Sequence, residues 1–82
     1  MFEFRINAIN NKFENIKEEI NNGKLLVYAK WEIEDLIDEA RELKSLVQTN
    51  ESVEELNTLL KQLNQYLYDI QSLIEKECST TL

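Results

Sequence analysis

The feature that most constrains the fold is a regular spacing of apolar residues in the middle of the chain. Apolar side chains recur there at alternating intervals of three and four: Leu26, Ala29, Ile33, Leu36, Ala40, Leu43 and Val47. This period places them on one stripe of an α-helix. The opposite face carries one aromatic residue and a row of acids: Trp31, Asp35, Asp38 and Glu42. We therefore expect a helix over about 24–48 with one buried and one exposed face.

The same spacing predicts a helix on either side of this stretch. The first apolar row predicts a helix over about 2–21 and consists of Phe2, Ile6, Ile9, Phe13, Ile16 and Ile20. The last row predicts a helix over about 52–77 and consists of Val53, Leu56, Leu60, Leu63, Leu67, Ile70 and Ile74. A flanking row of Leu59, Tyr66 and Leu73 widens the apolar face of the last helix. A wider face can contact two neighbouring helices.

Two short polar stretches separate the helices. Gly23 is suited to the left-handed backbone that ends a helix, and the apolar row restarts out of phase after it. Around Asn50 the second row also stops, and Ser52 with Glu55 matches a capping box. Short connections favour antiparallel neighbours. We expect one all-α domain over residues 1–82, either an antiparallel three-helix bundle or a coiled-coil hairpin, and a chain this small favours completion by self-association.

Composition and charge narrow the possible partners. Hydrophobic residues make up 43% of the chain and charged residues 30%, which is typical of a folded domain. The net charge of −7 disfavours nucleic acid and anionic membranes. No apolar run approaches the roughly 20 residues of a membrane span, and no signal peptide is recognised. The lone Cys78 is expected to be an inert thiol. We expect a cytoplasmic homo-oligomer without direct membrane insertion.

The residue types needed for most catalytic and metal sites are missing. The chain has no histidine, one cysteine and no glycine-rich loop. The usual general base, the nucleophile–histidine pairs and the thiolate or imidazole zinc sites are therefore excluded. The carboxylates of the middle helix lack the Glu-x-x-His motif of di-iron bundles. We expect no enzyme activity, no cofactor and no metal, and a solvated acidic face.

Aromatic residues outside the apolar rows are the candidates for binding. Val27, Tyr28 and Trp31 lie on the outer side of the middle helix, and Tyr68 is expected at a similar level on the last helix. Exposed aromatic clusters are enriched at binding hot spots. Two explanations remain open: a heterologous binding patch, or coverage by the third helix or a second subunit. Phe4 is also outside its row and is expected to cap the core at the opposite end.

The acidic row permits a second functional hypothesis. Asp35, Asp38 and Glu42 could imitate the phosphates of a nucleic acid, as in proteins that inhibit DNA-binding or restriction enzymes. However, three basic residues interleave with the acids: Lys30, Arg41 and Lys44. Asp38 and Arg41 are spaced to form an ion pair on a helix. These basic residues make the row less similar to a nucleic-acid backbone. Inhibition of a DNA-binding or restriction enzyme is therefore the alternative hypothesis, after a general protein-binding role.

The whole chain resembles the small lysis-inhibition accessory proteins of T-even bacteriophages, the rIII type. The resemblance rests on the length of 82 residues, the opening Met1-Phe2-Glu3-Phe4-Arg5-Ile6-Asn7 and a proline-free composition rich in Asn, Ile, Lys and Glu. It implies a protein of the host cytoplasm that binds the cytoplasmic segment of the phage holin and helps the antiholin to delay lysis. Such a role needs a helical binding surface and no active site.

Overall fold

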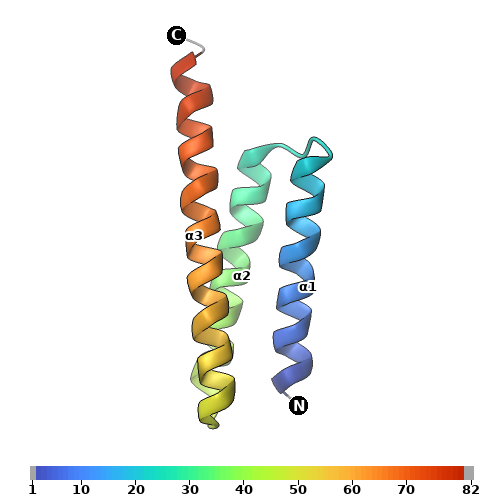
Figure 1. Ribbon diagram of the computed structural model, residues 1–82, viewed down its shortest axis with the longest axis vertical. Helices are drawn as coiled ribbons and strands as arrows, with labels where there is room; N and C mark the ends of the chain where they lie inside the picture. Colours follow the sequence, from blue (N-terminus) through green and yellow to red (C-terminus); the bar gives the residue numbers. More distant parts are fainter. Residues whose placement is uncertain (1, 81–82) are drawn as a thin grey trace.

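The protein is a bundle of three antiparallel helices (Figure 1). The computed structural model describes the backbone of residues 2–80 and the side chains of residues 3–76. Within the described backbone there is no strand; α1 spans Phe2–Asn21, α2 spans Leu26–Leu46 and α3 spans Asn50–Thr80. The predicted all-α three-helix bundle is confirmed. The expected side chains of Phe2 in the apolar row and of Cys78 as an inert thiol lie outside the described set.

The connection between α1 and α2 is a glycine-dependent turn. Gly23 has a φ of +102°, in the left-handed region that favours glycine. Its N–H donates to the carbonyl of Ile20 at 3.0 Å, and the N–H of Lys24 donates to the carbonyl of Glu19 at 3.0 Å. This pair of bonds is the Schellman motif, which satisfies the last carbonyls of a helix. The predicted stop at Gly23 is confirmed.

The predicted capping box at Ser52 and Glu55 is wrong. α3 begins at Asn50, so Ser52 lies inside its first turn instead of before it. The first helical bond runs from the N–H of Val53 to the carbonyl of Thr49 at 3.1 Å. An acid near a helix N-terminus is favourable, and Glu51 occupies the first turn of the longer helix. A box capped by Ser52 would start the helix at Val53, so the helix begins three residues earlier than the box would place it.

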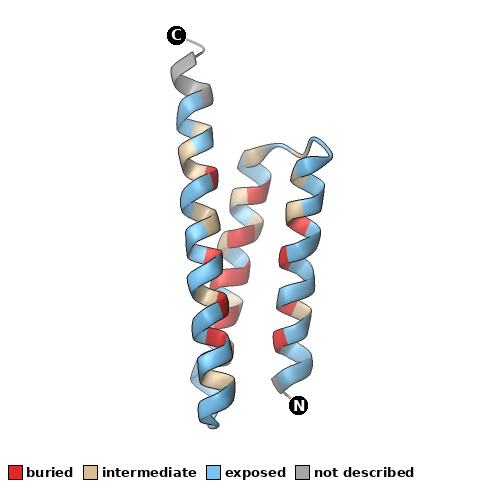
Figure 2. Cartoon of the chain, viewed as in Figure 1, coloured by how far each residue is buried: buried red, intermediate tan, exposed pale blue. Residues whose placement is uncertain are grey.

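The core follows the three apolar rows, which face inward on every helix (Figure 2). Its largest fully buried side chains are Ile9, Ile33, Leu43, Leu56, Leu63 and Ile70. Ala29 and Ala40 are also fully buried, so their small side chains let α2 approach its neighbours closely. Ile37 lies outside the predicted row yet is buried, because α2 packs against α3 as well as α1.

The three helices are not packed equally. α2 has its most extensive contacts with α3, fewer with α1, and α1 touches α3 least. α3 is also the longest helix, and its C-terminal part projects beyond the α1–α2 connection (Figure 1). Leu73, predicted to widen the buried face, is therefore half exposed. Phe4 is 80% exposed, so the prediction that it caps the core is wrong.

Candidate protein-binding surface

The first two turns of α2 present three large apolar side chains to solvent. Leu25 precedes the helix in an extended conformation, and its carbonyl accepts the N–H of Ala29 at 3.2 Å. This start directs Ala29 and Ile33 into the core. The helical period then forces Val27, Tyr28 and Trp31 outward, where each is about half exposed. The exposed aromatic surface is thus a consequence of how α2 buries its opposite face.

Tyr28 and Trp31 contact each other. Their ring centroids are 5.6 Å apart and their planes meet at 75°, an edge-to-face arrangement. Aromatic rings prefer this geometry because the positive edge of one ring faces the negative face of the other. Both rings remain about half exposed, so the third helix does not cover them. The pair forms an ordered aromatic surface, which we call the Tyr28–Trp31 patch.

Tyr68 makes no ring contact with this patch. It is 66% exposed on α3. Among the described residues the ring contacts join Tyr28 to Trp31 and Phe13 to Tyr66, and Tyr68 takes part in neither. The structure therefore brings together two of the aromatic candidates and leaves the third as an isolated exposed ring.

The acidic row of α2 is not neutralised by its basic neighbours. Asp35, Asp38 and Glu42 are exposed, and none of them belongs to an ion pair within the described side chains. The predicted pair between Asp38 and Arg41 is not formed. Lys30 contacts Glu34 at 3.8 Å and so does not reach the row. The three carboxylates therefore present their negative charges to solvent, although the sequence places basic residues between them.

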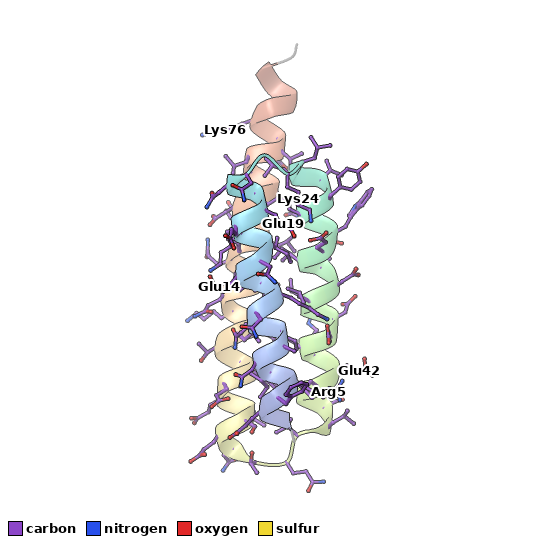
Figure 3. All side chains as sticks on the ribbon, turned by 90° about the vertical axis from the view of Figure 1, so that its right-hand side faces the viewer. Arg5, Glu14, Glu19, Lys24, Glu42 and Lys76 are labelled. Atoms are coloured by element: carbon purple, nitrogen blue, oxygen red, sulfur yellow. The ribbon has the colours of Figure 1, made fainter. Side chains whose placement is uncertain are left out.

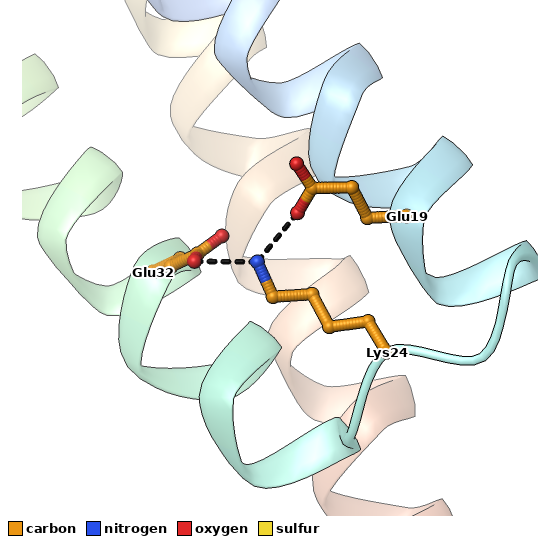
Figure 4. A network of polar contacts seen from close by, with 3 residues as sticks. All are labelled: Glu19, Lys24 and Glu32. Atoms are coloured by element: carbon orange, nitrogen blue, oxygen red, sulfur yellow. Dashed lines mark hydrogen bonds and ion pairs between the residues drawn. The ribbon is translucent and has the colours of Figure 1, made fainter.

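The lysines that face α2 are engaged with other carboxylates. The Nζ of Lys24 lies 2.5 Å from an oxygen of Glu19 on α1 and 2.5 Å from an oxygen of Glu32 on α2 (Figure 4). These two hydrogen bonds, first that of Glu19 and then that of Glu32, raise the pKa of Lys24 above its ordinary value. Lower down, Lys12 of α1 contacts Glu39 of α2 at 3.6 Å. Both contacts join the α1-facing edge of α2 to α1.

Sequence reasoning missed this Lys24 cluster. Its only signal in the sequence is a lysine directly after the turn, five residues after one glutamate and eight before another. Such spacings become a contact only when the register between α1 and α2 is known. The cluster joins the end of α1 to the beginning of α2. It leaves the Tyr28–Trp31 patch uncovered.

Open hollows lie between α1 and each of its two neighbours. A hollow of about 340 Å³ between α1 and α2 is lined by Lys12, Asn15, Ile16, Glu19, Glu32 and Asp35. A larger one of about 650 Å³ lies between α1 and α3, where Glu51, Glu54 and Glu55 form part of its wall. In the described part of the chain, no three histidine, cysteine or acidic side chains converge in a way that could hold a metal ion.

None of the described helices combines the length and the apolar character needed to cross a membrane. No protein-family model, curated protein or solved structure matches the chain.

Proposed function

We propose that this protein is a non-enzymatic helical module that binds another protein through the Tyr28–Trp31 patch. The observation that carries the proposal is the contact between two aromatic rings that are each about half exposed. Aromatic side chains bring a large contact area at a low cost in conformational entropy, and they dominate many binding hot spots. Their mutual contact limits their freedom further before a partner arrives.

The resemblance to lysis-inhibition accessory proteins makes a specific partner worth testing. Under this proposal the chain acts in the host cytoplasm of a phage infection, self-associates, and binds the cytoplasmic segment of the holin. The partner would meet a surface with an aromatic patch beside uncompensated acids. A basic or amphipathic segment is complementary to such a surface.

Inhibition of a DNA-binding or restriction enzyme is the second candidate. It is supported by the three acids Asp35, Asp38 and Glu42, which lie along one helix face without ion-pair partners among the described side chains. This candidate differs from the first in its dependence on salt. Contacts made mainly by exposed charges weaken steeply as ionic strength rises, whereas aromatic contacts do not.

Alanine variants of the patch test the first candidate. The double variant Tyr28→Ala/Trp31→Ala should lose at least tenfold in capture of the partner, because the hot-spot rings are removed. Tyr68→Ala is the matched control, since it removes an exposed ring that contacts no other ring of the described chain. Capture from cells that express the chain, including phage-infected cells, is measured alongside circular dichroism. Equal capture by the double variant would refute the patch.

Charge neutralisation tests the second candidate. The triple variant Asp35→Asn/Asp38→Asn/Glu42→Gln should abolish inhibition of a target enzyme if the acids imitate phosphates. Light scattering of the wild-type chain at several concentrations tests the self-association. A monomer at all concentrations would remove that part of the proposal.

A further inference from the structure

The groove between α1 and α2 is bordered by exposed apolar residues at both of its ends. Tyr28 and Leu46 lie 18 residues apart on α2, about five helical turns, so they share one line along the helix. Glu39, which contacts α1 through Lys12, lies close to the same line, about three turns after Tyr28. Tyr28 and Leu46 therefore border the groove between α1 and α2. Both are about half exposed.

Phe4 joins Leu46 at the lower end of this groove. Asn15 of α1 lines the hollow between α1 and α2. Phe4 precedes Asn15 by 11 residues, about three turns, so the two residues lie on the same side of α1. The contact of Lys12 with Glu39 sets the antiparallel register. Equal offsets from this contact reach the same level on the two helices. Phe4 is eight residues before Lys12 on α1. Leu46 is seven residues after Glu39 on α2, and Val47 is eight residues after it. Phe4 and Leu46 thus lie at one level, 80% and 50% exposed.

The middle of the same groove is polar and acidic. Asp35 lines its hollow, and Glu42 lies two turns further along α2, one turn before Leu46 at the lower end. Lys12 and Lys24 are already paired with glutamates, so they do not offset these acids. Arg5 of α1 lies at the same lower end as Glu42 in Figure 3 and adds one positive charge. The acids nevertheless remain in excess between the two apolar ends.

We infer that the partner is an amphipathic helix that lies lengthwise in the α1–α2 groove, with apolar residues at both ends and lysine or arginine between them. This inference rests on the proposed function, because the upper end of the groove is the Tyr28–Trp31 patch. The distance from Tyr28 to Leu46 corresponds to about 27 Å of helix, so the partner helix needs about 18 residues. Docking would convert the three-helix bundle into a four-helix arrangement.

Charge complementarity selects this occupant over a second copy of the chain. A second copy that presented the same face would place Asp35 and Glu42 against their own counterparts. Like charges in a closed interface oppose association. A helix with central basic residues instead supplies the missing partners of Asp35 and Glu42. Its apolar ends would cover Phe4 and Leu46 at one end and Tyr28 and Trp31 at the other.

Two synthetic 20-residue peptides of identical composition provide the probe. The first carries leucines in its end turns and lysines in its middle turns along one face, and the second exchanges these positions. Both lack tryptophan, so Trp31, which is the single tryptophan of the chain, reports binding by its fluorescence. The first peptide should bind at least tenfold more tightly than the second. Equal affinities would overturn the inference.

Variants at the lower end separate this inference from the proposed function. Phe4→Ala/Leu46→Ala should weaken binding of the first peptide about tenfold, and Asp35→Asn/Glu42→Gln should weaken it and flatten its dependence on salt. The matched control Tyr68→Ala/Leu73→Ala removes similarly exposed residues of α3 and should change nothing. All four positions in the two apolar variants are exposed, so the fold should be retained.

The outcomes are distinguishable. The Tyr28→Ala/Trp31→Ala variant lacks the reporter tryptophan, so its binding is measured by titration calorimetry, with the wild type measured in the same way. Loss of binding in this variant with full binding in Phe4→Ala/Leu46→Ala would uphold the patch and overturn the lengthwise helix. Full binding in both variants would refute both proposals. A dimer in light scattering that Phe4→Ala/Leu46→Ala dissociates would make a second copy the occupant and overturn the inference.

Discussion

The ring of Phe13 on α1 meets the ring of Tyr66 on α3 edge to face, with the centroids 5.3 Å apart and the planes at 77°. The Nζ of Lys17 lies 4.4 Å from the centroid of the Phe13 ring and adds a cation–π contact. Desolvation of the Tyr66 hydroxyl raises its pKa, while the nearby Lys17 partly opposes this shift. These side chains join the two helices that otherwise contact each other least.

Removal of the Phe13 ring should be strongly destabilising. Phe13→Ala should lower the free energy of unfolding by about 3–5 kcal/mol, because a buried ring is lost and a cavity remains. A double-mutant cycle with Phe13→Leu and Tyr66→Leu should give a coupling energy of about 0.5–1.5 kcal/mol for the ring pair. Urea unfolding followed by circular dichroism measures both. Strict additivity of the two leucine variants would show that the edge-to-face contact contributes nothing.

Gly23→Ala should destabilise the protein by about 1 kcal/mol through backbone strain alone. Gly23 has a positive φ, and a Cβ added there would meet no atom within 4 Å, so steric clash with neighbours plays no part. Gly23→Asn should cost less, because asparagine tolerates the left-handed region better than alanine does. Thermal unfolding of the two variants beside the wild type checks the order, and an alanine variant as stable as the wild type would contradict it.

The Lys24 cluster should make stability depend on alkaline pH. The folded-state pKa of Lys24 is raised above its ordinary value of 10.5, so folding favours the charged form. The contribution of this group is fully present below pH 10.5 and is lost as the pH rises through the folded-state pKa. The difference in unfolding free energy between wild type and Lys24→Met should therefore be constant from pH 7 to 9 and shrink at higher pH. A difference that does not change up to pH 11.5 would argue against the cluster.

Enlarging a fully buried alanine of α2 should separate the helices. Ala40 has no exposed surface, so Ala40→Leu must displace neighbouring side chains or backbone at a cost of about 1–3 kcal/mol. Ala8→Leu on α1 is the matched control, since Ala8 is only partly buried. Denaturant unfolding of the two variants is the measurement. A similar stability for both would mean that α2 is not as closely packed as its burial indicates.

The features that depend on a single helix or turn could be predicted from the sequence. The apolar rows follow the helical period, and the turn at Gly23 reflects a backbone conformation that few other residues adopt, so both were readable from local pattern. Ile37 was missed because a helix with two neighbours buries a wider stripe than a three-four row. Ser52 was misplaced because several residues near a helix start can serve as its first turn.

The candidate surface was predicted only in part for a related reason. The helical period alone places Tyr28 and Trp31 on the outer side of α2, so these two could be selected from the sequence. The exposure of Phe4, the isolation of Tyr68 and the Lys24 contacts depend on the register and tilt between helices. No single-sequence pattern specifies those quantities when the elements share one period.

The unequal packing of the three helices has a consequence for how the native state opens. α2 and α3 share the most extensive interface, whereas α1 is held mainly by α2 and by a few contacts to α3 such as Phe13 with Tyr66. Cooperative units of a protein open at free energies that reflect the interfaces they break. Amide hydrogens of α1 should therefore exchange through a partial opening that leaves the α2–α3 hairpin intact, while those of α2 and of the part of α3 packed against it should exchange only when the whole chain unfolds.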